Sequence, residues 1–419
     1  MTESDATGRR RAPRLPLGPR GKKVARTAGL AGAVLGFAAA GVAAGVALER
    51  YVVGRNRDVD DPYRHEPFGQ LPADRTLNVP VDGDVDLHVE VVEPAGGAAA
   101  ELTVVFVHGF CLDMGTFHFQ RRDLGGLVDP AIRMVFYDQP GHGRSDRLSA
   151  GDYSLEALGQ GVRRVIEEVT PSGPLVLIGH SMGGMTIMAL AEDDPELFRE
   201  RVVGVSFMST SAGGLDEVTF GLPDMVARIR RPLIPVLTGV NRLTPTMIDR
   251  ARRVSSDLAW LLTRRYGFGG EFPSPALVSY VEEMNSHTSA EVILAYLRTL
   301  FEHIRHDALE ALEGIETLVV TGDKDLLIPV EHSEEICRVL PNAELVVIED
   351  AGHVALMECH EQVNAHLAEF LSRASRAAAG AEPQPRAARL WSSLARAGKL
   401  RRAARRRTRR TGPGEPLAQ

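Results

Sequence analysis

Residues 174–183, PLVLIGHSMG, decide the fold, because they join an apolar run to a serine between two glycines. The run 174–178 is short and rich in branched side chains, as a buried parallel strand is, and residues 185–191 favour a helix. Ser181 therefore falls on a strand-to-helix turn, where flanking glycines remove the Cβ atoms that would collide. This G-x-S-x-G arrangement predicts a nucleophilic serine, although such pentapeptides also occur by chance in loops.

Strands and helices alternate on both sides of this stretch. Residues 76–81 and 85–92 flank Asp82-Gly83, a strong hairpin signal, and residues 154–169 place their apolar side chains on one helical face. Further apolar strands are predicted at 102–107, 132–137, 174–178, 202–208, 317–321 and 344–348. This alternation predicts an α/β fold, with an antiparallel start, a mostly parallel sheet and helices on both faces.

A helical insertion interrupts this rhythm at about residues 213–309. It contains six prolines and no clear strand, so we expect a cap between two strands of the sheet. Its first part, residues 222–237, is apolar, which suits a cover over an apolar site or a subdomain with its own core. With this cap, the expected catalytic domain covers residues 75–372.

Basic segments flank this acidic domain. Residues 1–26 carry eight Lys or Arg and two acids, residues 373–419 carry thirteen and two, and residues 27–372 keep a formal charge of −24. We therefore expect no nucleic-acid partner for the folded domain. The Ala- and Arg-rich tail, residues 373–419, suits either a solvated, disordered segment or an amphipathic segment at an anionic lipid surface.

The uncharged run at residues 27–48 predicts a membrane-spanning helix. Its 22 residues would extend about 33 Å, enough to cross a hydrocarbon core of about 30 Å. We expect a single-pass, membrane-anchored protein whose residues 1–26 stay in the cytoplasm and whose catalytic domain is extracytoplasmic. Nine Ala and five Gly make the run only modestly apolar, so a secreted protein with a cleaved signal peptide and a cytoplasmic protein remain alternatives.

Three cysteines, Cys111, Cys337 and Cys359, show neither metal-ligand spacing nor a disulfide framework. We expect free thiols, with a Cys337–Cys359 bridge as the alternative in an oxidising compartment. No metal site is expected from this pattern.

A serine nucleophile needs a base and an acid that orients the base. His353 follows an apolar strand and a glycine, and we favour it over His142, whose two flanking glycines indicate a tight structural turn. The orienting acid should also follow a strand end. Asp323 and Asp325 both do so, in the turn after residues 317–321.

Attack on a carbonyl also needs N–H donors for the oxyanion. A predicted strand runs into His108-Gly109-Phe110, where the glycine permits a tight exit and can turn the Phe110 N–H towards the site. The N–H of Met182, directly after the serine, is the second expected donor. We interpret His108 itself as a structural residue rather than a base.

These motifs resemble the α/β-hydrolase superfamily, in its serine esterase and lipase-like branch. Four family motifs occur in family order: His108-Gly109-Phe110, the block from Asp138 to Ser145, residues 179–183, and Gly322-x-x-Asp325 followed by Gly352-His353. Pro140 is a small departure, since arginine is commoner there in the family. The resemblance implies Ser181 as nucleophile, His353 as general base, Asp325 rather than Asp323 as orienting acid, and the backbone N–H groups of Phe110 and Met182 as oxyanion hole.

The resemblance further implies a serine hydrolase that cleaves a carboxylic ester through an acyl-enzyme, without a metal or organic cofactor. Membrane attachment and an apolar cap favour a small-molecule ester with an apolar or lipid-like acyl group. Alternatives are an amidase or thioesterase, a cofactor-free perhydrolase or hydroxynitrile lyase with the same triad, and a non-catalytic binding module. The serine argues against dehalogenases and epoxide hydrolases of this superfamily, which use aspartate at that position.

Overall fold

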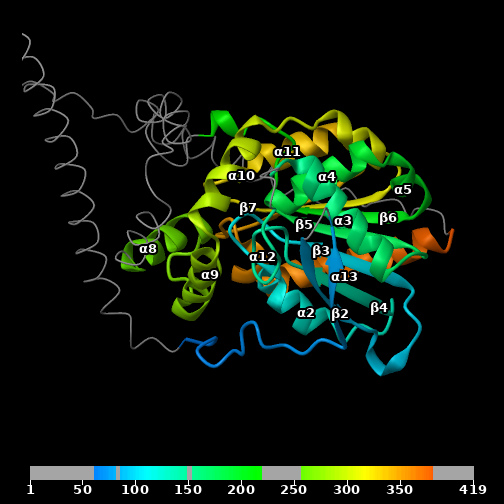
Figure 1. The fold of residues 1–419 in the computed structure, drawn as a ribbon, viewed down its shortest axis with the longest axis horizontal. Coiled ribbons are helices and arrows are strands. Elements are labelled where there is room, and N and C mark those ends of the chain that lie inside the picture. Colours follow the sequence, from blue (N-terminus) through cyan, green and yellow to red (C-terminus); the bar gives the residue numbers. More distant parts are fainter. Residues whose placement is uncertain (1–60, 82–84, 149–152, 219–255, 381–419) are drawn as a thin grey trace, which may run out of the picture. The chain divides into compact units, whose positions relative to one another are not determined.

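The computed structural model describes residues 61–81, 85–148, 153–218 and 256–380. Eight strands form one sheet: β1 (Arg75–Pro80), β2 (Asp86–Val92), β3 (Leu102–Val107), β4 (Ile132–Tyr137), β5 (Leu175–His180), β6 (Val202–Met208), β7 (Glu316–Gly322) and β8 (Glu344–Ile348). Their order is β1-β2-β4-β3-β5-β6-β7-β8 (Figure 1). β1, β2 and β4 pair antiparallel, and every pair from β4 to β8 is parallel. The predicted mostly parallel α/β sheet is therefore confirmed.

Helices cover both faces of the sheet (Figure 1). On one face lie α2 (His118–Leu124) and α13 (His360–Ala378), and on the other lie α3 (Leu155–Val169), α4 (Met182–Asp193), α5 (Pro195–Glu200) and α11 (Val330–Val339). Every residue of β3 and β5 is buried as a result. This explains why their sequences are continuously apolar rather than alternating.

The described residues between β6 and β7 are mainly helical. They form α8 (Ser256–Gly267), α9 (Pro275–His287) and α10 (Ala290–Glu302), with short 3₁₀ turns on either side. Ser274 and Ser289 begin α9 and α10 by accepting a backbone N–H of the first turn on the side-chain oxygen. The apolar stretch at residues 222–237 lies outside the described residues.

A strap, residues 61–70, ties α9 to the body of the domain. The Asp61 carboxylate accepts hydrogen bonds from the Ser274 hydroxyl (2.6 Å) and from a backbone N–H of the first turn of α9 (2.9 Å). Burial alone would raise the pKa of Asp61, but these bonds outweigh it and lower the pKa below its ordinary value. Phe68 stacks on Tyr280 of α9, with ring centroids 4.5 Å apart. The strap contacts α2 and α13 through the pairs Glu66–His118, Tyr63–Phe119 and Tyr63–His360.

The prediction of a membrane anchor needs correction. In the described part of the chain, no helix combines the length and apolarity that a membrane span requires. This finding contradicts the single-pass, membrane-anchored protein with an extracytoplasmic catalytic domain, and we assign no membrane span. Residues 27–48, 1–26 and 381–419 lie outside the described residues. The run 27–48 is uncharged but consists largely of Ala and Gly. Their small side chains add little apolar surface, so the run is less apolar than its lack of charge suggests.

Candidate active site

Three predicted side chains meet at the carboxyl edge of the parallel sheet. Ser181 directly follows β5, Asp325 follows β7 and His353 follows β8. The Nδ1–H of His353 donates to Asp325 Oδ2 (2.8 Å), and the Nε2 of His353 lies 3.0 Å from Ser181 Oγ. The three residues are only 8%, 5% and 7% exposed, so these contacts lie largely out of water. The arrangement can pass a proton from the hydroxyl to the imidazole.

Ser181 occupies a strained turn between β5 and α4. Its backbone has φ 52° and ψ −120°, a conformation that residues other than glycine rarely adopt. Its N–H donates to the carbonyl of Met208 (2.9 Å), and its own carbonyl accepts the hydroxyl of Thr210 (2.7 Å). A Cβ on Gly183 would lie 2.0 Å from the carbonyl oxygen of Val107. Only glycine therefore lets α4 start so close to β3.

The two competing carboxylates occupy different environments. Asp325 is buried, and its Oδ1 accepts backbone N–H groups of Leu327 and Ile328, both at 2.9 Å. Its other oxygen is thereby directed at His353. Asp323 is exposed. The structure thus brings Asp325 to the imidazole.

The predicted oxyanion donors lie beside the serine. Phe110 follows β3 in residues 108–112, which we call the oxyanion loop after its predicted role, and Met182 is the first residue of α4. Their side chains belong to one apolar cluster. A Cβ on Gly109 would lie 3.0 Å from Ser181 Cβ, so this loop packs directly on the nucleophile. The first N–H groups of a helix have no partner within it, which leaves the Met182 N–H suited to an anion.

Two buried histidines hold the oxyanion loop. The Nε2 of His142 accepts the N–H of Cys111 (3.1 Å), and its Nδ1–H donates to the Pro140 carbonyl (3.1 Å). The Nε2 of His108 accepts the N–H of Gln139 (2.8 Å). Both rings accept a hydrogen bond on Nε2 and are therefore neutral. Neither histidine lies where it would act as the base, in keeping with their interpretation as structural residues.

Backbone strain gathers at the same edge of the sheet. Among the described residues, four that are not glycine have φ between 46° and 60°: Cys111, Ser181, Ser209 and Asp350. Each lies within four residues after a strand end. Such strain persists where surrounding contacts overdetermine the backbone, and it is common at functional sites. No sequence pattern marks these positions apart from the glycines around Ser181.

Sequence reasoning missed Glu358, at the end of α12 (Ala355–Glu358). Its carboxylate accepts backbone N–H groups of Gly352 (2.8 Å), Gly269 (3.0 Å) and Gly270 (2.7 Å). Glu358 thereby joins the loop that carries His353 to the segment between α8 and α9. A glutamate that binds backbone groups from distant loops has no fixed spacing that a sequence could reveal.

A cavity of about 690 Å³ lies beyond the oxyanion loop. Its walls come from the strap, the segment after the oxyanion loop, the turn after β4, and α9; the lining includes Phe68, Asp113, Met114, Asp138, Tyr280 and Met284. The Asp138 carboxylate accepts the N–H groups of Met114 and Arg144, both at 2.8 Å, and so fixes this segment. The triad side chains do not line this cavity, so we do not assign it to the site.

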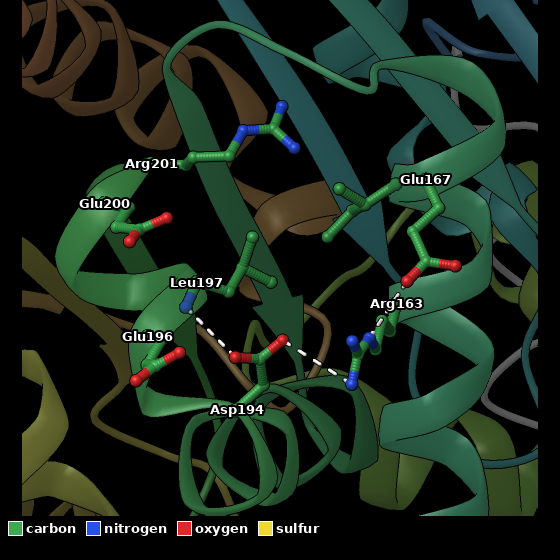
Figure 2. Close-up of a pocket in the computed structure, with 8 residues that line it drawn as sticks. Arg163, Glu167, Asp194, Glu196, Leu197, Glu200 and Arg201 are labelled. Carbon is green, nitrogen blue, oxygen red and sulfur yellow. Dashed lines mark hydrogen bonds and ion pairs between the residues drawn. The ribbon is translucent and has the colours of Figure 1, made fainter.

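A polar groove between α3 and α5 lies at the opposite edge of the sheet. Figure 2 shows Arg163 directed at Asp194 (3.7 Å) and Glu167 (3.0 Å) in this groove. Arg201, which also lines the groove, directly precedes β6, whereas the triad residues follow strand ends. We assign this groove no part in the site.

The described residues contain neither a disulfide bond nor a cluster of metal ligands. Cys111, Cys337 and Cys359 form no disulfide bond in the described residues, and each is half-buried. Within the described ranges, no three His, Cys, Asp or Glu side chains gather as metal ligands.

The buried histidines predict a loss of stability in mild acid. Burial lowers the pKa of His142 and of His303 to about 4, and burial with the adjacent His353 lowers that of His180 to about 3. Below pH 6.5 these histidines bind protons in the unfolded chain but stay neutral in the folded chain. The free energy of unfolding is therefore highest above pH 6.5 and decreases as pH falls towards 4. Each histidine removes up to about 1.4 kcal/mol per pH unit from the free energy of unfolding.

Urea unfolding at pH 7.5, 6.0 and 5.0 measures this effect. A His303→Gln variant should show a shallower fall in the free energy of unfolding than the wild type, because one proton fewer is taken up. A free energy that stays constant over this range would contradict the prediction.

Comparison with known proteins identifies the fold family. Residues 103–358 match the family described as the alpha/beta hydrolase fold. The chain belongs to this family. The resemblance inferred from the sequence is confirmed, and the eight-stranded sheet of this alpha/beta hydrolase is that of the fold.

Relatives and solved structures extend this result. A dihydrolipoyllysine-residue acetyltransferase component of an acetoin cleaving system from Pseudomonas putida is 30% identical over 288 residues, or 66% of this chain and 65% of that protein. A poly(3-hydroxyalkanoate) depolymerase from Ectopseudomonas oleovorans is 27% identical over 263 residues, or 62% of this chain and 81% of the relative. The structure of a thermophilic esterase from Thermogutta terrifontis matches with a TM-score of 0.53 and 24% identity, over 72% of this chain and 99% of the other.

These comparisons establish the class of protein. At 24% identity the esterase structure shows the fold alone, and the match spans just under two thirds of the Pseudomonas putida relative. Family membership places the chain among the alpha/beta hydrolases.

Proposed function

We propose that this alpha/beta hydrolase cleaves a carboxylic ester through Ser181, His353 and Asp325. One observation carries the proposal: His353 bonds Asp325 through Nδ1 and faces Ser181 Oγ through Nε2, at 2.8 Å and 3.0 Å. His353 takes the Ser181 proton, and the oxygen attacks the ester carbonyl. The N–H groups of Phe110 and Met182 receive the oxyanion, and the ester C–O bond breaks as His353 gives its proton to the departing alcohol. Water activated by His353 then hydrolyses the acyl-enzyme and releases the acid and Ser181.

An apolar or lipid-like acyl group fits the surroundings of the nucleophile best. The cluster that contains Met182 is built from apolar side chains of α3, α4, α10 and the turn after β7, and Phe110 packs against it. The Ectopseudomonas oleovorans relative is named as a depolymerase of a polyester, which is consistent with an ester substrate.

Two assays test the proposal. A fluorophosphonate probe should label the wild type and the Ser172→Ala control, whose serine is exposed, but not Ser181→Ala. Failure to label the folded wild type would favour the binding module instead. On p-nitrophenyl esters with acyl chains of 2 to 16 carbons, kcat/KM should rise at least about tenfold from acetate to a medium chain, since each buried methylene contributes about 0.8 kcal/mol. A sharp preference for acetate would contradict the apolar acyl group.

Matched p-nitroanilide and thioester substrates separate the alternatives. Faster turnover of the anilide or thioester than of the ester would indicate an amidase or thioesterase. Peroxide-dependent product or cyanohydrin cleavage would indicate the perhydrolase or the lyase. The acetyltransferase activity named for the Pseudomonas putida relative is not carried over to this chain.

A further inference from the structure

His180, the residue directly before Ser181, has no part in the triad, yet its imidazole is completely buried at the end of β5. Its Nε2–H donates a hydrogen bond to the backbone carbonyl of His353, 3.0 Å away. This bond fixes the tautomer that carries its proton on Nε2. The two imidazole rings lie side by side, with centroids 5.0 Å apart. His180 therefore holds the main chain of the proposed base rather than its side chain.

The other nitrogen of His180 faces the oxyanion loop. Nδ1 has no hydrogen-bond partner among the described residues. A Cβ built on Gly109 would lie 2.8 Å from this Nδ1 and 3.0 Å from Ser181 Cβ, so the edge of the imidazole packs on the loop. An unpaired buried nitrogen costs about 1–3 kcal/mol. If this position required only packing, an apolar side chain would give a more stable protein, because it would bury no unpaired nitrogen.

His180 is neutral, as a permanent donor of one hydrogen bond to the His353 carbonyl should be. Burial, with a smaller effect from His353, lowers the pKa of His180 to about 3. His180 consequently stays neutral when His353 accepts a proton from Ser181. It keeps one N–H for the His353 carbonyl and does not compete as a base.

We propose that His180 is a positioning residue that holds the His353 backbone and the oxyanion loop in register with Ser181. The inference rests on the proposed function, because His180 can have a positioning role only if the triad is catalytic. Three loops converge on one rigid ring: the turn of Ser181 by covalent linkage, the loop of His353 by a hydrogen bond, and Gly109 by contact. A displacement of about 1 Å among such groups costs on the order of 10²-fold in rate.

Two amide variants test this role. His180→Gln keeps an N–H donor at a reach similar to Nε2, whereas His180→Asn carries the same amide one methylene short of the His353 carbonyl. We expect His180→Asn to lower kcat and the rate of fluorophosphonate labelling at least about tenfold, with KM changed by less than about twofold, and His180→Gln to restore most of both rates.

His303 provides the matched control. It is also buried, its Nε2 donates to the Ser211 carbonyl (2.8 Å), and its Nδ1 has no partner among the described residues. His303→Asn should lower the melting temperature as His180→Asn does, while kcat falls less than about twofold. Gly109→Ala provides a second, less selective route, because its methyl group would crowd both the imidazole of His180 and Ser181 Cβ. It should lower kcat even if His180→Asn fails to fold.

The outcomes are distinct. Equal kcat in folded His180→Asn and wild type, or an equal loss in His303→Asn, overturns the positioning role while the proposed function stands. A rate for Gly109→Ala equal to that of the wild type also overturns it. If the wild type itself neither reacts with fluorophosphonate nor hydrolyses any ester, the proposed function falls, and the positioning role falls with it.

Discussion

Replacing Ser181 by alanine is expected to abolish ester hydrolysis, with kcat lowered by about six orders of magnitude. The hydroxyl at 3.0 Å from His353 Nε2 is the proposed nucleophile, and without it no acyl-enzyme forms. The remaining groups still bind the carbonyl and its oxyanion, so a weak rate above that of water persists. KM should change little, because the hydroxyl contributes its energy in the transition state rather than to ground-state binding.

The measurement is kcat on the best ester of the chain-length series, with Ser172→Ala as the control for loss of a serine. Because Ser181 is a small side chain at a strained turn, its replacement should leave the melting temperature close to that of the wild type. A folded Ser181→Ala protein that retains more than about 1% of wild-type kcat would mean that another group attacks the substrate.

Replacing Asp325 by asparagine is expected to lower kcat by about 10⁴-fold. The backbone N–H groups of Leu327 and Ile328 both point at Oδ1, so the new amide must present its oxygen to them and its NH₂ to His353. That NH₂ cannot accept the Nδ1–H. The imidazole must then carry its proton on Nε2, where the serine proton has to go.

Asp323→Asn is the matched control, two residues away in the same turn. Its carboxylate is exposed, and we expect kcat to stay within about twofold of the wild type. Equal losses in the two variants, or a larger loss in Asp323→Asn, would contradict the choice of Asp325. Unfolding by urea should accompany both assays, so that a change in kcat is not confused with a loss of folded protein.

Four strands were predictable to the residue: β3, β4 and β6, which are buried at nearly every position, and the edge strand β8, which is partly exposed. Residues 102–107, 132–137, 202–208 and 344–348 form β3, β4, β6 and β8 with those bounds. β5 runs two residues beyond the predicted 178, and α4 starts at Met182, three residues before the predicted helix. Gly183 and Gly184 make this start hard to predict, because glycine is a poor helix former. Gly183 is required by the closeness of β3, and Gly184 by the closeness of the Thr210 side chain.

In the candidate site, too, some residues could be predicted from the sequence and others could not. Ser181, Asp325 and His353 stand in short patterns at strand ends, so their convergence followed from a parallel sheet. The groups that hold them do not stand in such patterns: His142 binds Cys111, Glu358 binds Gly269, and each pair joins loops far apart in sequence. The membrane anchor was wrong because length and lack of charge were given more weight than the apolarity of an Ala- and Gly-rich run.

The strap, residues 61–70, lies upstream of the region that this chain shares with its family. The family match begins at residue 103, yet Asp61 caps α9 and Phe68 forms a wall of the neighbouring cavity. Two descendants of one ancestor with the same triad and different upstream segments would therefore set α9, and the shape of that cavity, differently. Substrate preference can diverge along this route while selection leaves every catalytic residue untouched.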